Sequence, residues 1–226
     1  MFQELRNIRA VLFDAGNTLI FPDYDFLQNL LADFGINIEL ATLRDLEDVA
    51  KRATVKRGAP KSWKVYFGTW LESAGVGEKD LPELLQRLWQ KHRRDGLWHL
   101  ADEGLTQVLS ELKKRRFLLG VVSNADGTLE QLLQELGLAT YFHSIVDSEL
   151  VGYRKPNPAI FEFALQQLQV SAEQALYVGD SYEWDVVGAE NAGLKAILFD
   201  PLDKHPEYNC NRITTLRTLL KLPASP

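Results

Sequence analysis

From residue 98 onward, short apolar runs alternate with stretches of helical periodicity, and this alternation restricts the fold more than any other feature. The apolar runs are continuous and bounded by turn residues, as expected for strands that are buried on both faces. Strands alternating with helices are joined by right-handed crossovers into a sheet that helices cover. We therefore expect an α/β fold with a doubly wound, mostly parallel, Rossmann-like sheet. Its strands are expected at 10–13, 117–122, 145–146, 175–178 and 196–199.

Residues 21–97 interrupt this alternation and show helical patterns only. The apolar positions of the first pattern lie on one helical face that ends at Gly35, and no strand pattern occurs between residues 22 and 98. We expect residues 21–97 to form a helical domain inserted after the first strand, and residues 1–20 and 98–226 to form the α/β domain. Helices are expected from about 25 to 34, 39–57, 61–74 and 79–94 in the insertion, and at 105–112, 129–136, 160–168, 182–192 and 213–221 in the α/β domain.

Composition and charge exclude several classes of function. The chain of 226 residues has a net charge of −6, so a broad basic surface for nucleic acid is not expected. Cys210 is the only cysteine, which rules out an intramolecular disulfide and a cysteine metal site. The sequence has neither a signal-peptide pattern nor an apolar run long enough to span a membrane. We expect a cytoplasmic monomer or homodimer that binds neither nucleic acid nor membrane.

Polar residues follow three of the expected strands. Asp14 ends the first, Ser123 and Asn124 follow 117–122, and Asp180 comes soon after 175–178. Open α/β sheets bind ligands outside the carboxyl ends of their strands, so these side chains are expected to converge in one crevice. One such strand end would mean little, because Ser and Asp often cap helices. Three of them, together with Lys155 in a Gly- and Pro-rich loop, indicate an active site.

Four segments, in this order, resemble the four motifs of the haloacid dehalogenase superfamily. The resemblance covers residues 9–20 and 98–200, and it implies that the helical insertion is the cap that covers the family's active site and selects substrates. The pattern is most similar to the capped subfamily that includes the REG-2-like hydrolases. The motif-like segments are 13–19 (FDAGNTL), 122–124 (VSN), Lys155–Pro156 with Pro158 and Phe161, and 179–185 (GDSYEWD) with Gly188–Ala189 and Ala192–Gly193.

The resemblance implies Mg²⁺-dependent chemistry at phosphorus. Asp14 would attack the phosphorus atom and form an aspartyl-phosphate, which water then hydrolyses. Asp14, Asp180 and the main-chain carbonyl of Gly16 would be ligands of Mg²⁺, a cation that prefers oxygen. Asp185 would act through a water molecule or orient Lys155.

The same resemblance assigns the phosphate-binding groups. The ammonium of Lys155 would neutralise the nucleophile and a phosphate oxygen, and Ser123 would donate a hydrogen bond to the phosphoryl group. Asn124 would belong to the phosphate-binding loop and position it. The implied partner is a small phosphorylated substrate.

Gly16 departs from the family's pattern. Most phosphatases of the family carry a second aspartate at this position, which protonates the leaving alkoxide and then activates water. General acid–base catalysis is worth about 10²–10⁴ in rate, and neither Gly16 nor Asn17 can supply it. Asp23 or Asp25, at the start of the insertion, is a candidate replacement.

Four functions remain open on these residues. The paired acids Asp180 and Asp185 favour a Mg²⁺-dependent phosphohydrolase, either weak or specific for good leaving groups. A 2-haloacid dehalogenase also lacks the second aspartate, but it typically has an aromatic residue in place of Gly16 and no acid in place of Asp180. A phosphonate hydrolase would need a cap lysine, and Lys51, Lys56, Lys61 and Lys64 look like solvated helix positions. A non-catalytic relative that binds a phosphorylated ligand or a protein partner is the fourth possibility.

Overall fold

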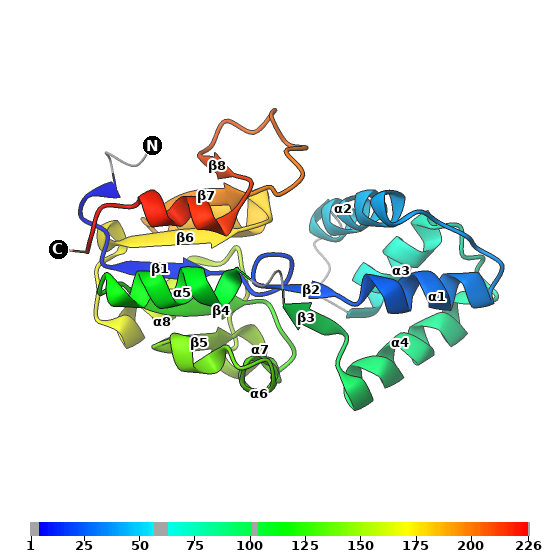
Figure 1. Ribbon diagram of the computed structural model, residues 1–226. Coiled ribbons are helices and arrows are strands. Elements are labelled where there is room, and N and C mark those ends of the chain that lie inside the picture. The colour runs from blue at the N-terminus through cyan, green and yellow to red at the C-terminus, as the bar shows by residue number, and fades with distance from the viewer. Residues whose placement is uncertain (1–4, 57–62, 101–103, 226) are drawn as a thin grey trace. The chain divides into compact units, whose positions relative to one another are not determined.

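The computed structural model describes residues 5–56, 63–100 and 104–225 (Figure 1). The chain divides into two compact units, which we call the sheet unit (Met1–Phe21 with Leu100–Pro226) and the helical unit (Pro22–His99). Three expectations fall outside the described residues: the end of the helix at 57, the start of the next helix at 61, and the side chain of Lys61. No helix within the described residues is both long enough and apolar enough to cross a membrane.

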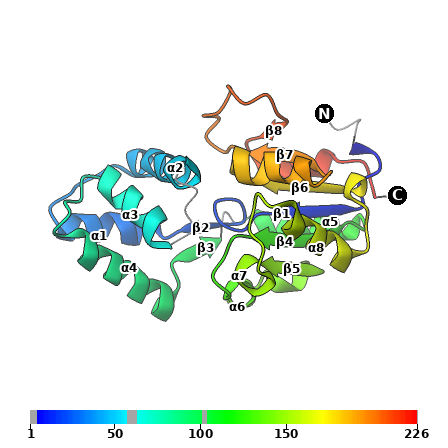
Figure 2. The same ribbon diagram turned by 180° about the vertical axis from the view of Figure 1, so that it is seen from behind.

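The main sheet of the sheet unit has six strands among the described residues, in the order β5-β4-β1-β6-β7-β8, and every neighbouring pair is parallel. Helix α5 lies on one face of this sheet and α8 on the other (Figures 1 and 2), which confirms the doubly wound α/β class. The strands are β1 (Ala10–Phe13), β4 (Leu118–Ser123), β5 (Ser144–Asp147), β6 (Ala175–Gly179), β7 (Lys195–Phe199) and β8 (Arg212–Ile213). The helices are α5 (Leu105–Lys114), α6 (Leu129–Glu135), α7 (Ser148–Val151), α8 (Pro158–Leu168) and α9 (Gly188–Asn191).

The middle of the sheet explains the continuous apolar runs of the sequence. All four residues of β1 are fully buried, because β4 and β6 flank the strand and helices cover both faces. Apolar side chains from β6 and α8 belong to one shared core cluster, which includes Tyr177, Phe161 and Leu165. Burial on both faces removes the alternation of polar and apolar residues that a strand with one exposed face would show.

Two helices expected in the second half of the chain are present, but they are not regular α-helices over the expected ranges. The helix expected at 182–192 is a π-helical turn, Tyr182–Val187, followed by the short helix α9. The turn forms because the carbonyl of Ser181 accepts the N–H groups of both Asp185 and Val186. The helix expected at 213–221 is a 3₁₀ helix, Leu216–Lys221, preceded by β8. A strand of two residues is too short to produce a recognisable pattern.

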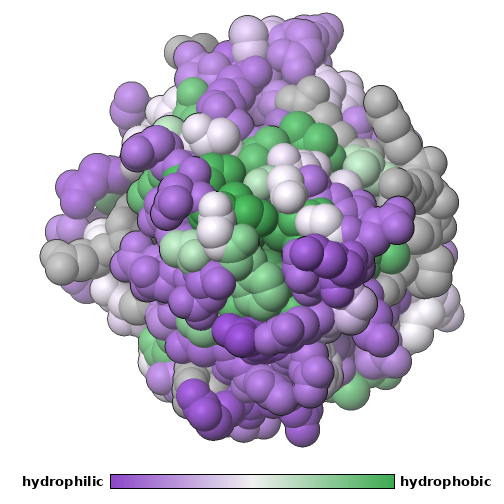
Figure 3. Space-filling model, turned by 90° about the vertical axis from the view of Figure 1, so that its right-hand side faces the viewer, coloured by the Kyte–Doolittle hydropathy of each residue, from purple (hydrophilic) through white to green (hydrophobic). Residues whose placement is uncertain are grey.

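The described residues of the helical unit form four helices around a core of their own. Figure 3 shows some apolar side chains of this unit at the surface among hydrophilic ones. Phe67 and Trp70 are each 1% exposed, so these aromatic residues belong to the core. The sequence patterns did not indicate β2 (Ile20–Pro22) and β3 (Trp98–Leu100), which pair as a two-stranded sheet where the chain passes between the units. The helices are α1 (Tyr24–Asp33), α2 (Leu40–Lys56), α3 (Trp63–Ser73) and α4 (Leu81–Asp95).

Candidate active site

The candidate site lies at the carboxyl ends of three neighbouring strands. Asp14 follows β1, Ser123 ends β4, and Asp180 follows β6, and these strands are adjacent in the order β4-β1-β6. The N–H of Asp14 donates to the carbonyl of Val178 at 2.9 Å, which extends the pairing of β1 with β6 into the site. Parallel pairing therefore brings together residues that are distant in the sequence.

The ammonium group of Lys155 is the centre of the polar contacts. It donates to Asp14 Oδ1 at 2.6 Å, to Asp185 Oδ1 at 2.6 Å and to the hydroxyl of Tyr177 at 2.9 Å. Burial alone would lower the pKa of Lys155, but the charges of Asp14 and Asp185 outweigh burial and raise it above its usual value. Lys155 is therefore positively charged at neutral pH.

Asn124 holds the backbone of the residue that carries this ammonium. Its side-chain oxygen accepts the N–H of Lys155 at 2.7 Å, and its amide nitrogen donates to the carbonyl of Lys155 at 3.0 Å. The bond between Lys155 and Pro156 is cis. The two hydrogen bonds fit the expected positioning role of Asn124. Ser123 is buried next to it in the chain, and its hydroxyl makes no hydrogen bond with another group of the described residues.

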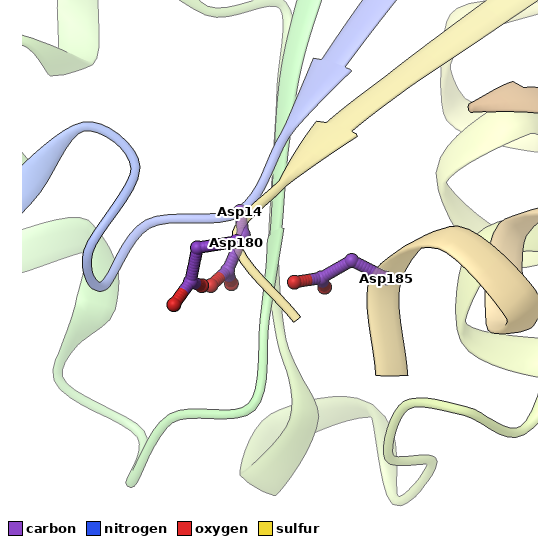
Figure 4. Close-up of side chains that lie close together, drawn as sticks. All are labelled: Asp14, Asp180 and Asp185. Carbon is purple, nitrogen blue, oxygen red and sulfur yellow. The ribbon is translucent and has the colours of Figure 1, made fainter. Parts of the chain in front are cut away.

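Three carboxylates form a group that could hold a metal ion. Asp14, Asp180 and Asp185 each offer an oxygen atom, and these atoms lie within 4.8 Å of one another (Figure 4). The other oxygen of Asp185, Oδ2, accepts the N–H of Ser181 at 2.9 Å. A Cβ atom on Gly179 would lie 2.5 Å from Oδ2 of Asp185, so the absence of a side chain at Gly179 allows this carboxylate to occupy its position.

Sequence reasoning did not single out Tyr177, although its hydroxyl contacts Lys155. One sequence feature could have indicated Tyr177: it is a tyrosine in a strand that is otherwise apolar and buried on both faces. Burial and the charges of Asp185 and Asp14 raise the pKa of Tyr177 well above its usual value, so its phenol is neutral. Burial also raises the pKa of Asp185, an effect that the charge of Lys155 opposes and Asp14 reinforces.

The loop after Asp14 turns tightly and contains Gly16. The carbonyl of Ala15 accepts the N–H groups of residues 18, 19 and 20, at 3.3, 2.9 and 3.0 Å. Asn17 has a φ of 61°, whereas Gly16 does not have a positive φ. The side-chain oxygens of Asn17 and Thr18 are buried and have no hydrogen-bond partner among the described residues. The backbone of Gly16 is therefore in a conformation that an aspartate could also adopt.

Asp23 does not suit the role of a replacement acid. Its carboxylate accepts the N–H of Phe26 at 2.9 Å and lies 3.1 Å from His99 Nε2 and 3.5 Å from Lys91 Nζ. Partial burial would raise the pKa of Asp23, but the hydrogen bonds from Phe26 and His99 and the nearby positive charges lower it. A carboxyl group with a lowered pKa is ionised at neutral pH and cannot donate a proton. Asp25 is exposed in the first turn of α1.

A family model for haloacid dehalogenase-like hydrolases matches residues 8–193, which is most of the chain. The chain belongs to the haloacid dehalogenase-like hydrolase family. This match spans the strand that ends at Asp14, the loop of Lys155 and the turn that carries Asp180 and Asp185. The resemblance inferred from the four motifs is confirmed.

Relatives match this chain over different shares of their own length. The haloacid dehalogenase-like hydrolase domain-containing protein 3 of Bos taurus is 35% identical over 58% of this chain, and the match spans only 53% of that relative. The chain thus matches about half the length of that relative. The glyceraldehyde 3-phosphate phosphatase of Methanopyrus kandleri is 39% identical over 84% of this chain and 83% of its own. Among solved structures, the HAD hydrolase YfnB from Bacillus subtilis, bound to magnesium, matches with a TM-score of 0.71 and 27% identity, and covers 94% of this chain and 97% of its own.

Proposed function

We propose that the protein is a Mg²⁺-dependent phosphohydrolase that acts on a small phosphorylated metabolite, with Asp14 as the nucleophile. The observation that carries this proposal is the buried ammonium of Lys155, which lies 2.6 Å from Asp14 within a group of three carboxylates. A positive charge and a potential metal site beside one carboxylate suit a reaction in which that carboxylate approaches an anionic phosphate. The 39% identical relative named glyceraldehyde 3-phosphate phosphatase supports the same substrate class.

The residues of the site fit Mg²⁺. The acidic group offers only oxygen atoms, which are the ligands that Mg²⁺ prefers. Asp14, Asp180 and the main-chain carbonyl of Gly16 would bind the ion, and Asp185 would act through a water molecule. When bound, the ion supplies positive charge that offsets the negative charge of the phosphoryl oxygens.

The proposed reaction has two chemical steps, and the residues of the site bind and orient the reacting groups. An oxygen of Asp14 forms a bond to phosphorus while the bond from phosphorus to the leaving oxygen breaks, which produces an aspartyl-phosphate. Water then attacks this phosphorus, the bond to Asp14 breaks, and inorganic phosphate leaves. Ser123 donates to a phosphoryl oxygen, and Lys155 holds Oδ1 of Asp14 in place. Gly16 offers no proton to the leaving group, so the enzyme favours leaving groups that are stable as anions.

We also propose that the helical unit (Pro22–His99) serves as the cap that selects substrates. Glyceraldehyde 3-phosphate is the first metabolite to test, because it is named for the relative that is 39% identical.

The test measures phosphate release from an aryl phosphate and from glyceraldehyde 3-phosphate, with Mg²⁺ or with EDTA. We expect release only with Mg²⁺, and its loss by at least about 10³-fold in Asp14→Asn. Full turnover in EDTA would contradict the metal site. Chloride release from 2-chloropropionate without metal would identify a dehalogenase. Binding of phosphorylated metabolites without turnover would identify the protein as a non-catalytic relative, a function that the lack of an acid at position 16 also allows.

A further inference from the structure

The hydroxyl of Tyr177 lies among three polar groups of the candidate site. Its side chain is fully buried on β6, and its ring packs edge-on against Phe161 with centroids 5.0 Å apart. The hydroxyl oxygen lies 2.9 Å from Lys155 Nζ, 2.8 Å from the carbonyl oxygen of Val122 and 3.3 Å from Asp185 Oδ1. It therefore connects β6, the end of β4 and the ammonium of Lys155.

The direction of these hydrogen bonds follows from the number of protons. A neutral phenol has one proton, and both the carbonyl of Val122 and the carboxylate of Asp185 can only accept it. Val122 is the nearer acceptor, at 2.8 Å against 3.3 Å, so Tyr177 donates to Val122. The lone pairs of the hydroxyl are then directed to a donor, and Lys155 is that donor at 2.9 Å. Tyr177 is consequently a fixed acceptor for the ammonium.

The ammonium of Lys155 has three N–H groups and three acceptors in this site. Asp14 Oδ1 and Asp185 Oδ1 accept at 2.6 Å, and the hydroxyl of Tyr177 accepts at 2.9 Å. All three protons are therefore used within the protein. In this arrangement the ammonium is directed at Asp14 and Asp185, and its charge lies beside the oxygen of Asp14 that would approach the phosphate.

We propose that Tyr177 is a positioning residue that acts through Lys155. It accepts the third N–H group and thereby keeps the ammonium directed at Asp14 and Asp185. The contact between Tyr177 and Lys155 is a fact of the structure, and its kinetic consequence rests on the proposed function. Held in this way, Lys155 orients the carboxylate of Asp14.

The first test compares Tyr177→Phe, which removes only the hydroxyl, with Ser144→Ala. Ser144 is a matched control on the edge strand β5 of the same sheet, because its buried hydroxyl donates to Gln167 at 2.6 Å. With an aryl phosphate and Mg²⁺, we expect kcat of Tyr177→Phe to fall about tenfold while KM stays within about twofold. The reason is that the third N–H group of Lys155 becomes a buried donor without an acceptor, next to the reacting carboxylate. Ser144→Ala should keep both constants.

Two results would overturn the inference in this assay. One is an unchanged kcat in folded Tyr177→Phe. The other is a KM that rises as much as kcat falls, which would assign the hydroxyl to substrate binding instead of to the orientation of Asp14. Tyr177→Met also lacks the hydroxyl and fills the strand with a flexible apolar side chain. It should give the same fall in kcat, and it replaces Tyr177→Phe if that variant does not fold.

The second test separates this inference from the proposed function, because it needs no turnover. The shift in unfolding midpoint caused by Tyr177→Phe is measured in the wild type and in Lys155→Met. If Tyr177 acts through Lys155, most of the shift should disappear in the Lys155→Met background. An equal shift in both backgrounds would show a purely structural hydroxyl and would overturn the inference, even if the wild type proves to be a phosphatase.

Discussion

Removal of the Lys155 ammonium is the perturbation whose effect the structure defines best. In Lys155→Met, an apolar chain of similar length replaces a side chain that is 1% exposed. The change leaves the carboxylates of Asp14 and Asp185 without their shared cation, although their side chains are only 10% and 1% exposed. Breaking a buried ion pair by removing one partner costs about 3–5 kcal/mol. We expect a loss of free energy of unfolding in this range when EDTA is present.

Mg²⁺ should offset part of this loss. The ion would bring positive charge to the same carboxylates, so the stabilisation by Mg²⁺ should be larger in Lys155→Met than in the wild type. A ligand present at 100 times its Kd stabilises the folded state by about 2.7 kcal/mol. The proposed Mg²⁺ site and Lys155 thus neutralise the same acidic group by different means.

Urea unfolding followed by circular dichroism, with EDTA or with Mg²⁺, measures both effects. Lys113→Met is the control within the sheet unit, because the ammonium of Lys113 is exposed and donates to the carbonyl of Thr140 at 2.8 Å. This control should change stability by less than about 0.5 kcal/mol. A loss below about 1 kcal/mol for Lys155→Met in EDTA would refute the view that Lys155 compensates two buried carboxylates.

Three further predictions concern the same site. Gly16→Asp should raise kcat on an alkyl phosphate by about 10²-fold and change kcat on an aryl phosphate little, because only the alkoxide leaving group needs a proton. Phosphate release measures both rates, and equal gains on the two substrates would exclude this explanation. Gly179→Ala should displace the carboxylate of Asp185 and lower the free energy of unfolding by about 1–3 kcal/mol. Calorimetry should then show weaker Mg²⁺ binding, whereas an unchanged Mg²⁺ affinity would separate Gly179 from the metal site. Because the pKa of Lys155 is raised on folding, its stabilising effect should be complete below the unfolded pKa of about 10.4 and decline as the pH rises through the folded value. Urea unfolding between pH 8 and pH 11 should show a steeper decline for the wild type than for Lys155→Met, and parallel curves would contradict this assignment.

The sequence alone determined the α/β class, the helical insertion and the family. These depend on local patterns, since an apolar run such as 10–13 is recognisable without knowledge of its neighbours. The same patterns placed Asp14, Ser123 and Asp180 at strand ends, where parallel pairing brings them to one edge. Local patterns did not reveal β8 or the π-helical turn at Tyr182–Val187, because two residues or one additional residue in a turn leave no periodic signal.

Only the tertiary structure decided which groups surround Asp14, the proposed nucleophile. Lys155 lies 141 positions from Asp14, and Tyr177 reaches its ammonium from a strand whose other residues are apolar. The structure also engages the carboxylate of Asp23 within the helical unit, a contact that the sequence did not indicate. The periodicity of a sequence indicates which face of a helix or strand is buried. The acceptor of each N–H group of Lys155 depends instead on the distances between helices, strands and loops. For this reason the sequence located the candidate site, and the fold decided how Lys155 is held in it.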